Sequence, residues 1–179
     1  MTAASPEWRR AFIALWPDAP SRHALACSRP PAAPGVRPLH PADLHLTLAF
    51  LGDLDAATAS ALTAHLSGAA PPAMTLDTLH TERWPDEHRP RVQVLCYAEA
   101  EALTRLHATV SAALRAVGVP VESRPYRPHV TLARLTRAST LAVHGLPPSS
   151  RFVRFALCHG TDSAPGEPRY HSIAEWTAA

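Results

Sequence analysis

The chain contains 179 residues, of which 46% are hydrophobic and 18% charged, a composition typical of one folded domain with a sizeable core. Its formal net charge of +2 is too small to indicate a surface that wraps long nucleic acids. All 17 basic residues are arginine, so the chain has no lysine for a P-loop, a Schiff base or a lysyl-adenylate. Arginine suits bidentate phosphate contacts, so a local phosphate site stays open.

The expected environment is the cytoplasm. The three cysteines are far apart in the sequence and form no CxxC pair, which favours reduced thiols over a disulfide framework. No apolar run approaches the roughly 18 residues of a membrane-spanning helix. Residues 1–10 lack the apolar segment of a signal peptide. We therefore expect a cytoplasmic monomer with a single domain over residues 1–179.

Proline-rich loops separate short secondary-structure elements in the first half of the chain. In chain order we expect a strand, a helix, a second strand, a second helix and two further strands, at residues 10–16, 19–28, 44–51, 56–67, 74–79 and 92–97. Asp18 and Asp55 precede the two helices, and each can cap its helix by accepting backbone hydrogen bonds.

The clearest helix covers residues 99–117, where apolar side chains recur at spacings of three and four and Gly118 is placed to end it. Three further strands are predicted at residues 129–135, 151–158 and 169–176. Strands and helices mix without the regular alternation of a barrel, so the predicted fold class is α+β.

A duplicated motif is the most informative feature. Residues 45–51, HLTLAFL, recur 84 residues later at 129–135 as HVTLARL. The shorter pattern His-x-Thr has little weight alone, because it also starts at His107 and His159, where it does not continue as Leu-Ala. The extended match on two predicted strands is expected by chance in fewer than about one chain in a thousand.

A strand and a helix precede each copy of the motif at nearly equal distances. Phe12 lies 33 residues before His45, and Val94 lies 35 residues before His129. Two such strand–helix–strand units predict a pseudo-two-fold axis, which brings equivalent residues to one shared cleft.

The spacing within the motif has a chemical meaning. Residues i and i+2 of a strand face the same side, so each copy presents its histidine and its threonine together. Two imidazoles and two hydroxyls in one cleft can hold phosphate oxygens and deliver a base and an acid to opposite sides of phosphorus. The simpler interpretation, two polar strand faces, suits a single motif better than a duplicated pair.

With these motifs the chain resembles the two-histidine phosphoesterases, and among them the bacterial RNA 2′,3′-cyclic phosphodiesterases, also called 2′-5′ RNA ligases. The resemblance is carried by residues 45–52 and 127–134, with weaker similarity at 10–15, 84–85 and 169–170. It implies a bilobal fold in which two antiparallel sheets line a central cleft with helices outside. It also implies the opening of a 2′,3′-cyclic phosphate to a 2′-phosphomonoester, without metal or cofactor.

The resemblance implies roles for individual residues. His45 and His129 are the expected catalytic residues, with His129 as the base and His45 as the acid. Thr47 and Thr131 are expected to hold the phosphate of an RNA end or a small cyclic nucleotide. Residues 91–95 lack the tryptophan often found at this point in the family. This departure affects what the resemblance implies about the surroundings of the nucleobase, and it leaves the implied chemistry unchanged.

Four further residues are candidates for substrate contacts. By resemblance, Phe50 lies near the nucleobase and Arg134 contacts the phosphate. Arg134 follows His129 by five residues, so a bulge or the strand end is needed to turn it toward the cleft. Tyr126 and Arg127 precede the second motif. Tyr126 can stack on a nucleobase and Arg127 can contact a phosphate, or both can anchor the loop.

A polar cluster surrounds Trp84. His80, Glu82, Asp86 and His88 are residue types that bind metals, but their spacing matches no zinc pattern. We interpret the segment as a solvated loop and predict no metal site. Trp84 is then either a packing residue or a platform for a nucleobase.

Three alternatives to the cyclic phosphodiesterase stay open. The same chemistry in reverse forms 2′-5′ bonds in RNA. A different cyclic phosphate, such as a nicotinamide or ADP-ribose derivative, can be the substrate. A binding module for RNA or nucleotides without catalysis is the third, and the two intact motifs count against it.

Overall fold

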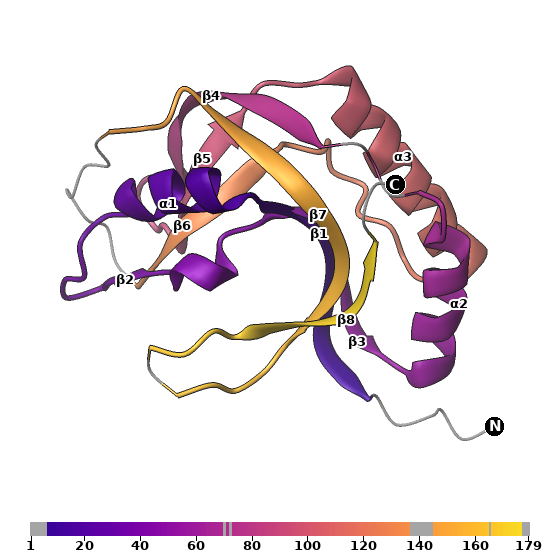
Figure 1. Ribbon diagram of the computed structural model, residues 1–179. Helices are drawn as coiled ribbons and strands as arrows, with labels where there is room; N and C mark the ends of the chain where they lie inside the picture. Colours follow the sequence, from indigo (N-terminus) through magenta and orange to yellow (C-terminus); the bar gives the residue numbers. More distant parts are fainter. Residues whose placement is uncertain (1–6, 70, 72, 137–144, 165, 177–179) are drawn as a thin grey trace.

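The computed structural model describes residues 7–69, 71, 73–136, 145–164 and 166–176 (Figure 1). Its elements in chain order are β1 (Trp8–Pro17), α1 (Ala19–Cys27), β2 (Val36–Pro38), the 3-10 helix η1 (Pro41–Asp43), β3 (Leu46–Leu54), α2 (Ala56–Leu66), β4 (Met74–Trp84), β5 (Val92–Tyr97), α3 (Glu101–Ala116), β6 (His129–Leu135), β7 (Ser149–Gly160) and β8 (Tyr170–Trp176). The predicted strands and helices are all present. The sequence did not predict β2 and η1, because three residues are too few to show a periodicity.

The helices begin and end where the sequence places the signals. Asp18 accepts a hydrogen bond from the backbone N–H of Ser21 at 2.9 Å, and Asp55 accepts one from Thr58 at 2.7 Å. These bonds satisfy backbone donors that the first turn of a helix leaves free. α3 ends before Gly118, whose φ of +75° is a conformation that glycine adopts without strain.

One antiparallel sheet joins the two halves of the chain. The strand order is β1-β3-β6-β5-β4-β7-β8, β2 pairs with β6, and an additional pairing of β1 with β7 closes a ring. We expected two antiparallel sheets. They are joined because β7 is long enough to reach both halves: residues 149–152 pair with β4 and residues 152–158 pair with β1. The α+β class is confirmed.

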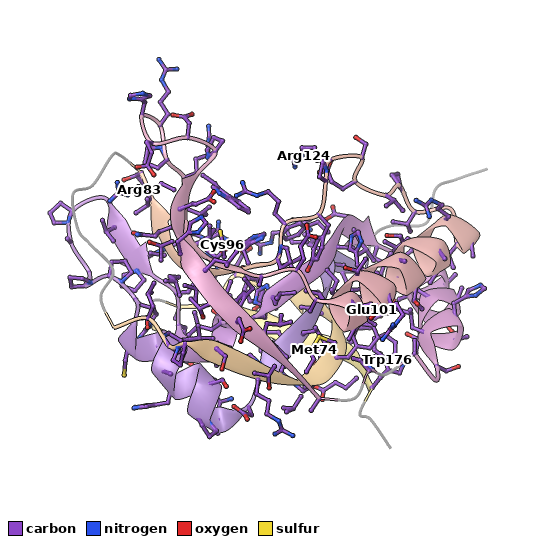
Figure 2. The ribbon with its side chains drawn as sticks, turned by 90° about the horizontal axis from the view of Figure 1, so that it is seen from above. Met74, Arg83, Cys96, Glu101, Arg124 and Trp176 are labelled. Carbon is purple, nitrogen blue, oxygen red and sulfur yellow. The ribbon has the colours of Figure 1, made fainter. Side chains whose placement is uncertain are left out.

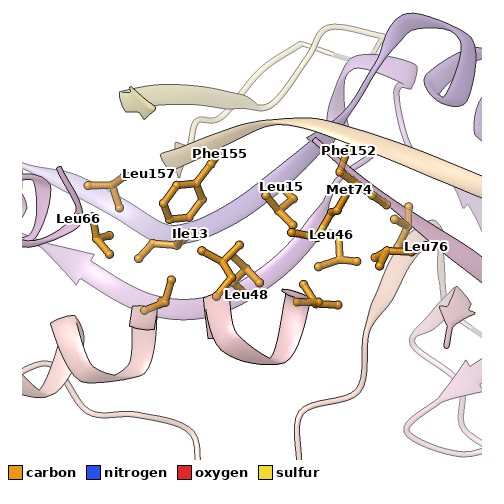
Figure 3. Packing of buried hydrophobic residues seen from close by; sticks show 14 of the residues in the cluster. Ile13, Leu15, Leu46, Leu48, Leu66, Met74, Leu76, Phe152, Phe155 and Leu157 are labelled. Atoms are coloured by element: carbon orange, nitrogen blue, oxygen red, sulfur yellow. The ribbon is translucent and has the colours of Figure 1, made fainter. Parts of the chain in front are cut away.

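The apolar sides of the motif strands form part of the main core. Leu46 and Leu48 of β3 are 0% and 3% exposed, and they pack with Ile13 and Leu15 of β1 (Figure 3). α3 packs on β3 and on α2, whereas α1 packs on β7 and η1 (Figure 1). Burial of these aliphatic side chains determines which face of each motif strand is left for polar residues.

No helix in the described ranges is long and apolar enough to cross a membrane.

Candidate active site

The histidines and threonines of the two motifs lie on one face of the sheet. β3 and β6 meet where Leu46 is paired with Val130, and both of these side chains are fully buried in the core. Side chains alternate along a strand, so the residues on either side of this pair face away from the core.

The two imidazoles are held in the same way. Nδ1 of His45 lies 2.6 Å from the carbonyl oxygen of Asp43, and Nδ1 of His129 lies 2.8 Å from that of Arg127. A carbonyl only accepts hydrogen bonds, so Nδ1 carries the proton in both rings. Each neutral imidazole therefore keeps an unprotonated Nε2, the atom that accepts or, once protonated, donates a proton during catalysis.

β3 carries a bulge directly after its threonine. Thr47 is paired with Ala14 of β1. The next paired residue of β3 is Ala49, whose partner Ile13 is adjacent to Ala14 in the chain. Leu48 is therefore an extra residue on β3, and the alternation of side chains restarts after it.

β6 carries the equivalent bulge. Thr131 is paired with Val94 of β5. The next paired residue is Ala133, whose partner Gln93 is adjacent to Val94. Leu132 is the extra residue, at the same motif position as the bulge of β3. The duplication thus includes a backbone irregularity as well as the side chains.

The bulges turn the fifth residue after each histidine toward the cleft. Nη2 of Arg134 lies 3.3 Å from the hydroxyl oxygen of Tyr170, whose ring centroid is 5.1 Å from that of His45. Phe50 is 73% exposed, and its ring lies 6.4 Å from that of Phe12, which stacks on His45. The structure brings Arg134 and Phe50 to the cleft, and their roles stay predictions.

Aromatic rings enclose His45. Its ring centroid lies 4.8 Å from that of Phe12, 4.9 Å from Trp16 and 5.1 Å from Tyr170. Burial lowers the pKa of His45 to about 4, against the hydrogen bond to the Asp43 carbonyl. The nearby positive charge of Arg134 lowers the pKa of His45 further.

A buried carboxylate fixes the start of the first motif. Asp43 is 2% exposed, and both of its oxygens accept a hydrogen bond from the backbone N–H of Arg169, at 3.0 and 3.1 Å. This contact ties η1 to the segment that carries Tyr170. The carbonyl of Asp43 that holds His45 is thereby positioned relative to β8.

His129 has polar surroundings that differ from those of His45. The ring centroid of Trp84 lies 4.3 Å from that of His129, and the guanidinium of Arg127 lies 4.8 Å from the Trp84 ring. Burial lowers the pKa of His129, and the carboxylate of Glu82 acts in the opposite direction. The two catalytic candidates are thus pseudo-symmetric in backbone geometry and different in electrostatics.

Glu82 connects the groups around His129. Its carboxylate accepts hydrogen bonds from the indole N–H of Trp84 at 2.6 Å, from Nε2 of His80 at 2.8 Å and from Arg127 at 2.5 Å. The bonds from Trp84 and His80 are the main reasons why the pKa of Glu82 falls to about 2. We interpreted residues 80–84 as a loop; they belong to β4, which extends to Trp84. Arg127 binds this carboxylate, which fits its anchoring alternative.

Tyr126 has contacts that do not suit the expected nucleobase platform. Its ring stacks on His107 of α3 at 4.1 Å, and its hydroxyl donates a hydrogen bond to the backbone carbonyl of Thr47 at 3.0 Å. Burial raises the pKa of Tyr126. The side chain therefore links α3 to the first motif strand, which agrees with the anchoring alternative.

One group of described residues has metal-ligand chemistry. Donor atoms of His80, Glu82 and Cys96 lie within 4.8 Å of one another. In Figure 2, Cys96 lies inside the molecule, between the labelled residues Arg83 and Glu101. Glu82 already binds the cation Arg127, which opposes a second positive charge at this carboxylate. Our expectation of a metal-free site stays a prediction.

Sequence reasoning missed three residues around the histidines. Tyr170 and Trp16 contact His45, and Glu82 organises the groups beside His129. Trp16 and His45 are on adjoining strands whose register the sequence does not reveal. Tyr170 lies at the start of the last predicted strand, within the segment 169–170 of weak family similarity, which suggested no role for its ring.

The arrangement suits transfer at phosphorus. Two imidazoles with unprotonated Nε2 atoms, two threonine side chains and one arginine lie on the same face of the sheet. Hydroxyl and guanidinium groups donate hydrogen bonds to phosphate oxygens, and paired imidazoles supply a proton acceptor and a proton donor.

Known proteins are similar to this chain in sequence and in fold. Residues 16–146 match the family model described as the 2′-5′ RNA ligase superfamily. The RNA 2′,3′-cyclic phosphodiesterase of Escherichia coli (strain K12) is 31% identical over 178 residues, which cover 95% of this chain and 97% of that protein. The protein of the same name from Bacillus subtilis (strain 168) is 35% identical over 98 residues, and the match spans about half of it, 54% of its length.

Solved structures agree over nearly the whole length. E. coli LigT in complex with 3′-AMP has a TM-score of 0.77 and 29% identity, covering 96% of this chain and 98% of that one. The protein TT0787 of Thermus thermophilus has a TM-score of 0.73 and 28% identity, covering 94% and 97%. The similarity includes both motif strands and the helices between them. The chain therefore belongs to the 2′-5′ RNA ligase superfamily.

Proposed function

We propose that the protein hydrolyses 2′,3′-cyclic phosphates of RNA ends or small nucleotides to 2′-phosphomonoesters, without a metal ion. The observation that carries the proposal is the pair of imidazoles, His45 and His129, each with Nδ1 bound to a backbone carbonyl, which leaves Nε2 of the neutral ring unprotonated. Relatives named RNA 2′,3′-cyclic phosphodiesterase support a phosphoesterase. LigT structures with 3′-AMP, ATP and NADP+ support a nucleotide-like ligand.

The reaction needs one base and one acid on opposite sides of phosphorus. In the proposed step, Nε2 of His129 takes a proton from water while the water oxygen bonds to phosphorus. The bond from phosphorus to O3′ breaks, and protonated Nε2 of His45 gives its proton to O3′. The acid role of His45 is what the family resemblance implies; because burial lowers its pKa to about 4, this role needs bound substrate to favour the protonated imidazole.

The remaining groups bind the phosphate. The hydroxyls of Thr47 and Thr131 donate hydrogen bonds to the non-bridging oxygens, and Arg134 neutralises charge that develops as water attacks. The anionic phosphate between two imidazoles also raises the pKa of both, so the proton that the acid needs is held once substrate is bound.

Ligation is the second candidate. The same base takes a proton from a 5′-hydroxyl in place of water, its oxygen bonds to phosphorus of a 2′,3′-cyclic phosphate, and the same acid protonates O3′ as the bond from phosphorus to O3′ breaks, which forms a 2′-5′ bond. The superfamily match supports this direction. Water outcompetes the hydroxyl unless the second RNA strand is bound, so hydrolysis is the main activity that we propose.

The proposal is tested with a panel of 2′,3′-cyclic nucleotides and short RNAs that end in a cyclic phosphate. The purified protein is incubated with each in EDTA, and products are separated by chromatography that distinguishes 2′- from 3′-phosphates. We expect 2′-phosphates at the same rate with and without chelator. Loss of activity in EDTA and its return with Zn²⁺ or Mn²⁺ contradicts the proposal.

A further inference from the structure

Two arginines are directly opposed on neighbouring strands next to the candidate site. Arg37 of β2 is paired directly with Arg134 of β6 in the antiparallel ladder. Paired residues point to the same face, with Cβ atoms about 4.5–5.5 Å apart. Arg134 contacts Tyr170 beside His45, so Arg37 also lies on the cleft face.

Like charges in this position repel each other. Both side chains are exposed, and neither has a carboxylate within ion-pair distance among the residues that the structure describes. A directly opposed pair of equal charges destabilises a sheet. An anion between the two guanidinium groups removes this cost, because each guanidinium offers a planar set of donors to phosphate.

The burial of its neighbour fixes the face of β2 on which Arg37 lies. The neighbouring Val36 is 5% exposed and packs against Ala133 and Leu135 on the opposite face. This small cluster anchors an edge strand of three residues. The pairing with β6 and this apolar contact together hold β2, and they leave Arg37 on the same face as Arg134.

We propose that Arg37, together with Arg134, binds a second phosphate, the one on the 5′ side of the terminal nucleoside of the substrate. The inference rests on the proposed function, which places the reacting cyclic phosphate between the two motifs. Arg37 is paired with Arg134 on the same face, four residues along β6 from the Leu46–Val130 pair at which the motifs meet. The pair therefore favours RNA ends over cyclic nucleosides that carry one phosphate only.

Three substrates test the site: adenosine 2′,3′-cyclic phosphate, its 5′-phosphorylated form, and a dinucleotide that ends in the same cyclic phosphate. Arg37→Gln is compared with wild type, and Arg115→Gln, an exposed arginine of α3, is the control with the same change in charge. We expect Arg37→Gln to lower kcat/KM about tenfold or more for the substrates with a second phosphate, the scale of a lost charged hydrogen bond. The nucleoside with one phosphate should change less than about twofold.

The two substrates that carry a second phosphate show whether the site recognises a 5′-phosphate or an internucleotide phosphate. A loss for both shows that a 5′-phosphate suffices, and a loss for the dinucleotide alone shows recognition of the internucleotide linkage; either supports the site. An equal loss for all three substrates, no loss for any, or the same loss in Arg115→Gln overturns it.

A binding measurement tests the role of Arg37 independently of whether the proposed function is correct. The affinity of a dinucleotide with a terminal 2′-phosphate is measured by calorimetry for wild type and Arg37→Gln, at low and at moderate salt. We expect weaker binding in the variant and a smaller salt dependence. If wild type turns over none of the three substrates, the proposed function fails, and the calorimetry alone decides on Arg37.

Discussion

Leu46 and Val130, the middle residues of the two His-x-Thr motifs, are paired with each other across β3 and β6. The strands run in opposite directions, so one step along the register puts His45 beside Thr131 and His129 beside Thr47. Each half of the site therefore combines an imidazole from one motif with a hydroxyl from the other. The duplication makes one shared site because the two motifs meet at their centres.

Removing either imidazole should stop most of the reaction. We expect His45→Ala and His129→Ala each to lower kcat by at least about a hundredfold, the scale of general acid–base catalysis. The double variant should be only slightly slower than the slower single variant, because the two groups act as a unit.

A substrate with an activated leaving group assigns the two roles. Such a group needs no acid, so it should restore turnover of His45→Ala and not of His129→Ala. If turnover is restored in His129→Ala instead, His129 is the acid and His45 is the base. Full activity of either single variant rules out the two-histidine mechanism. Circular dichroism of each variant checks that it is folded.

The pH dependence of the rate should be shifted toward acid. Burial lowers the pKa of both His45 and His129, so we expect a bell-shaped kcat/KM profile with both limbs below pH about 6.5, the value of a free histidine. A bound phosphate raises both pKa values, so the kcat profile should lie at higher pH. A kcat/KM profile centred above pH about 7 contradicts this electrostatic description.

The stability of the protein should also depend on His45. Its pKa is about 4 in the folded protein and about 6.5 in the unfolded chain, so the unfolded state binds more protons between these values. The free energy of unfolding therefore falls as pH falls from about 6.5 to about 4. Urea unfolding at several pH values should show a smaller fall for His45→Gln than for wild type. His23→Gln, on the exposed side of α1, is the control and should keep the wild-type slope.

The threonines should act through their hydroxyls. Thr47→Val and Thr131→Val each remove a phosphate donor, and loss of such a donor costs about 2.7–4 kcal/mol in transition-state stabilisation. Thr→Ser keeps the hydroxyl and should retain far more activity in kcat/KM. Thr47 is 8% exposed, so thermal unfolding is measured alongside to separate packing from catalysis. Equal losses in serine and valine variants show that the methyl group matters.

Glu82 should keep the pKa of His129 from falling further. Its negative charge favours the protonated imidazole, and it neutralises Arg127. In Glu82→Gln we expect a lower His129 pKa, measured by the NMR titration of the ring protons, and an acid shift of one limb of the rate profile. Glu122→Gln, which breaks the exposed pair with Arg124, is the matched control. An unchanged His129 pKa in Glu82→Gln contradicts the role.

Local patterns in the sequence were sufficient to predict the elements and to single out the two candidate histidines, whose catalytic roles stay predictions. Asp18 and Gly118 mark helix ends because capping and left-handed backbone depend on one or two residues. The alternation of side chains in a strand puts His45 and Thr47 on one face wherever that strand lies. The spacing of the repeat can also be read from the sequence alone, and it predicted two equivalent units.

The tertiary structure decided which other residues reach the cleft. Arg134 faces His45 only because Leu132 is an extra residue on β6, and a bulge depends on the register with β5, which no local pattern determines. The sequence position of Tyr126 is compatible with stacking on a nucleobase, but in the structure its ring packs on His107 of α3. Such contacts, like the opposition of Arg37 and Arg134, join residues far apart in the chain, and they exist only once the sheet has closed.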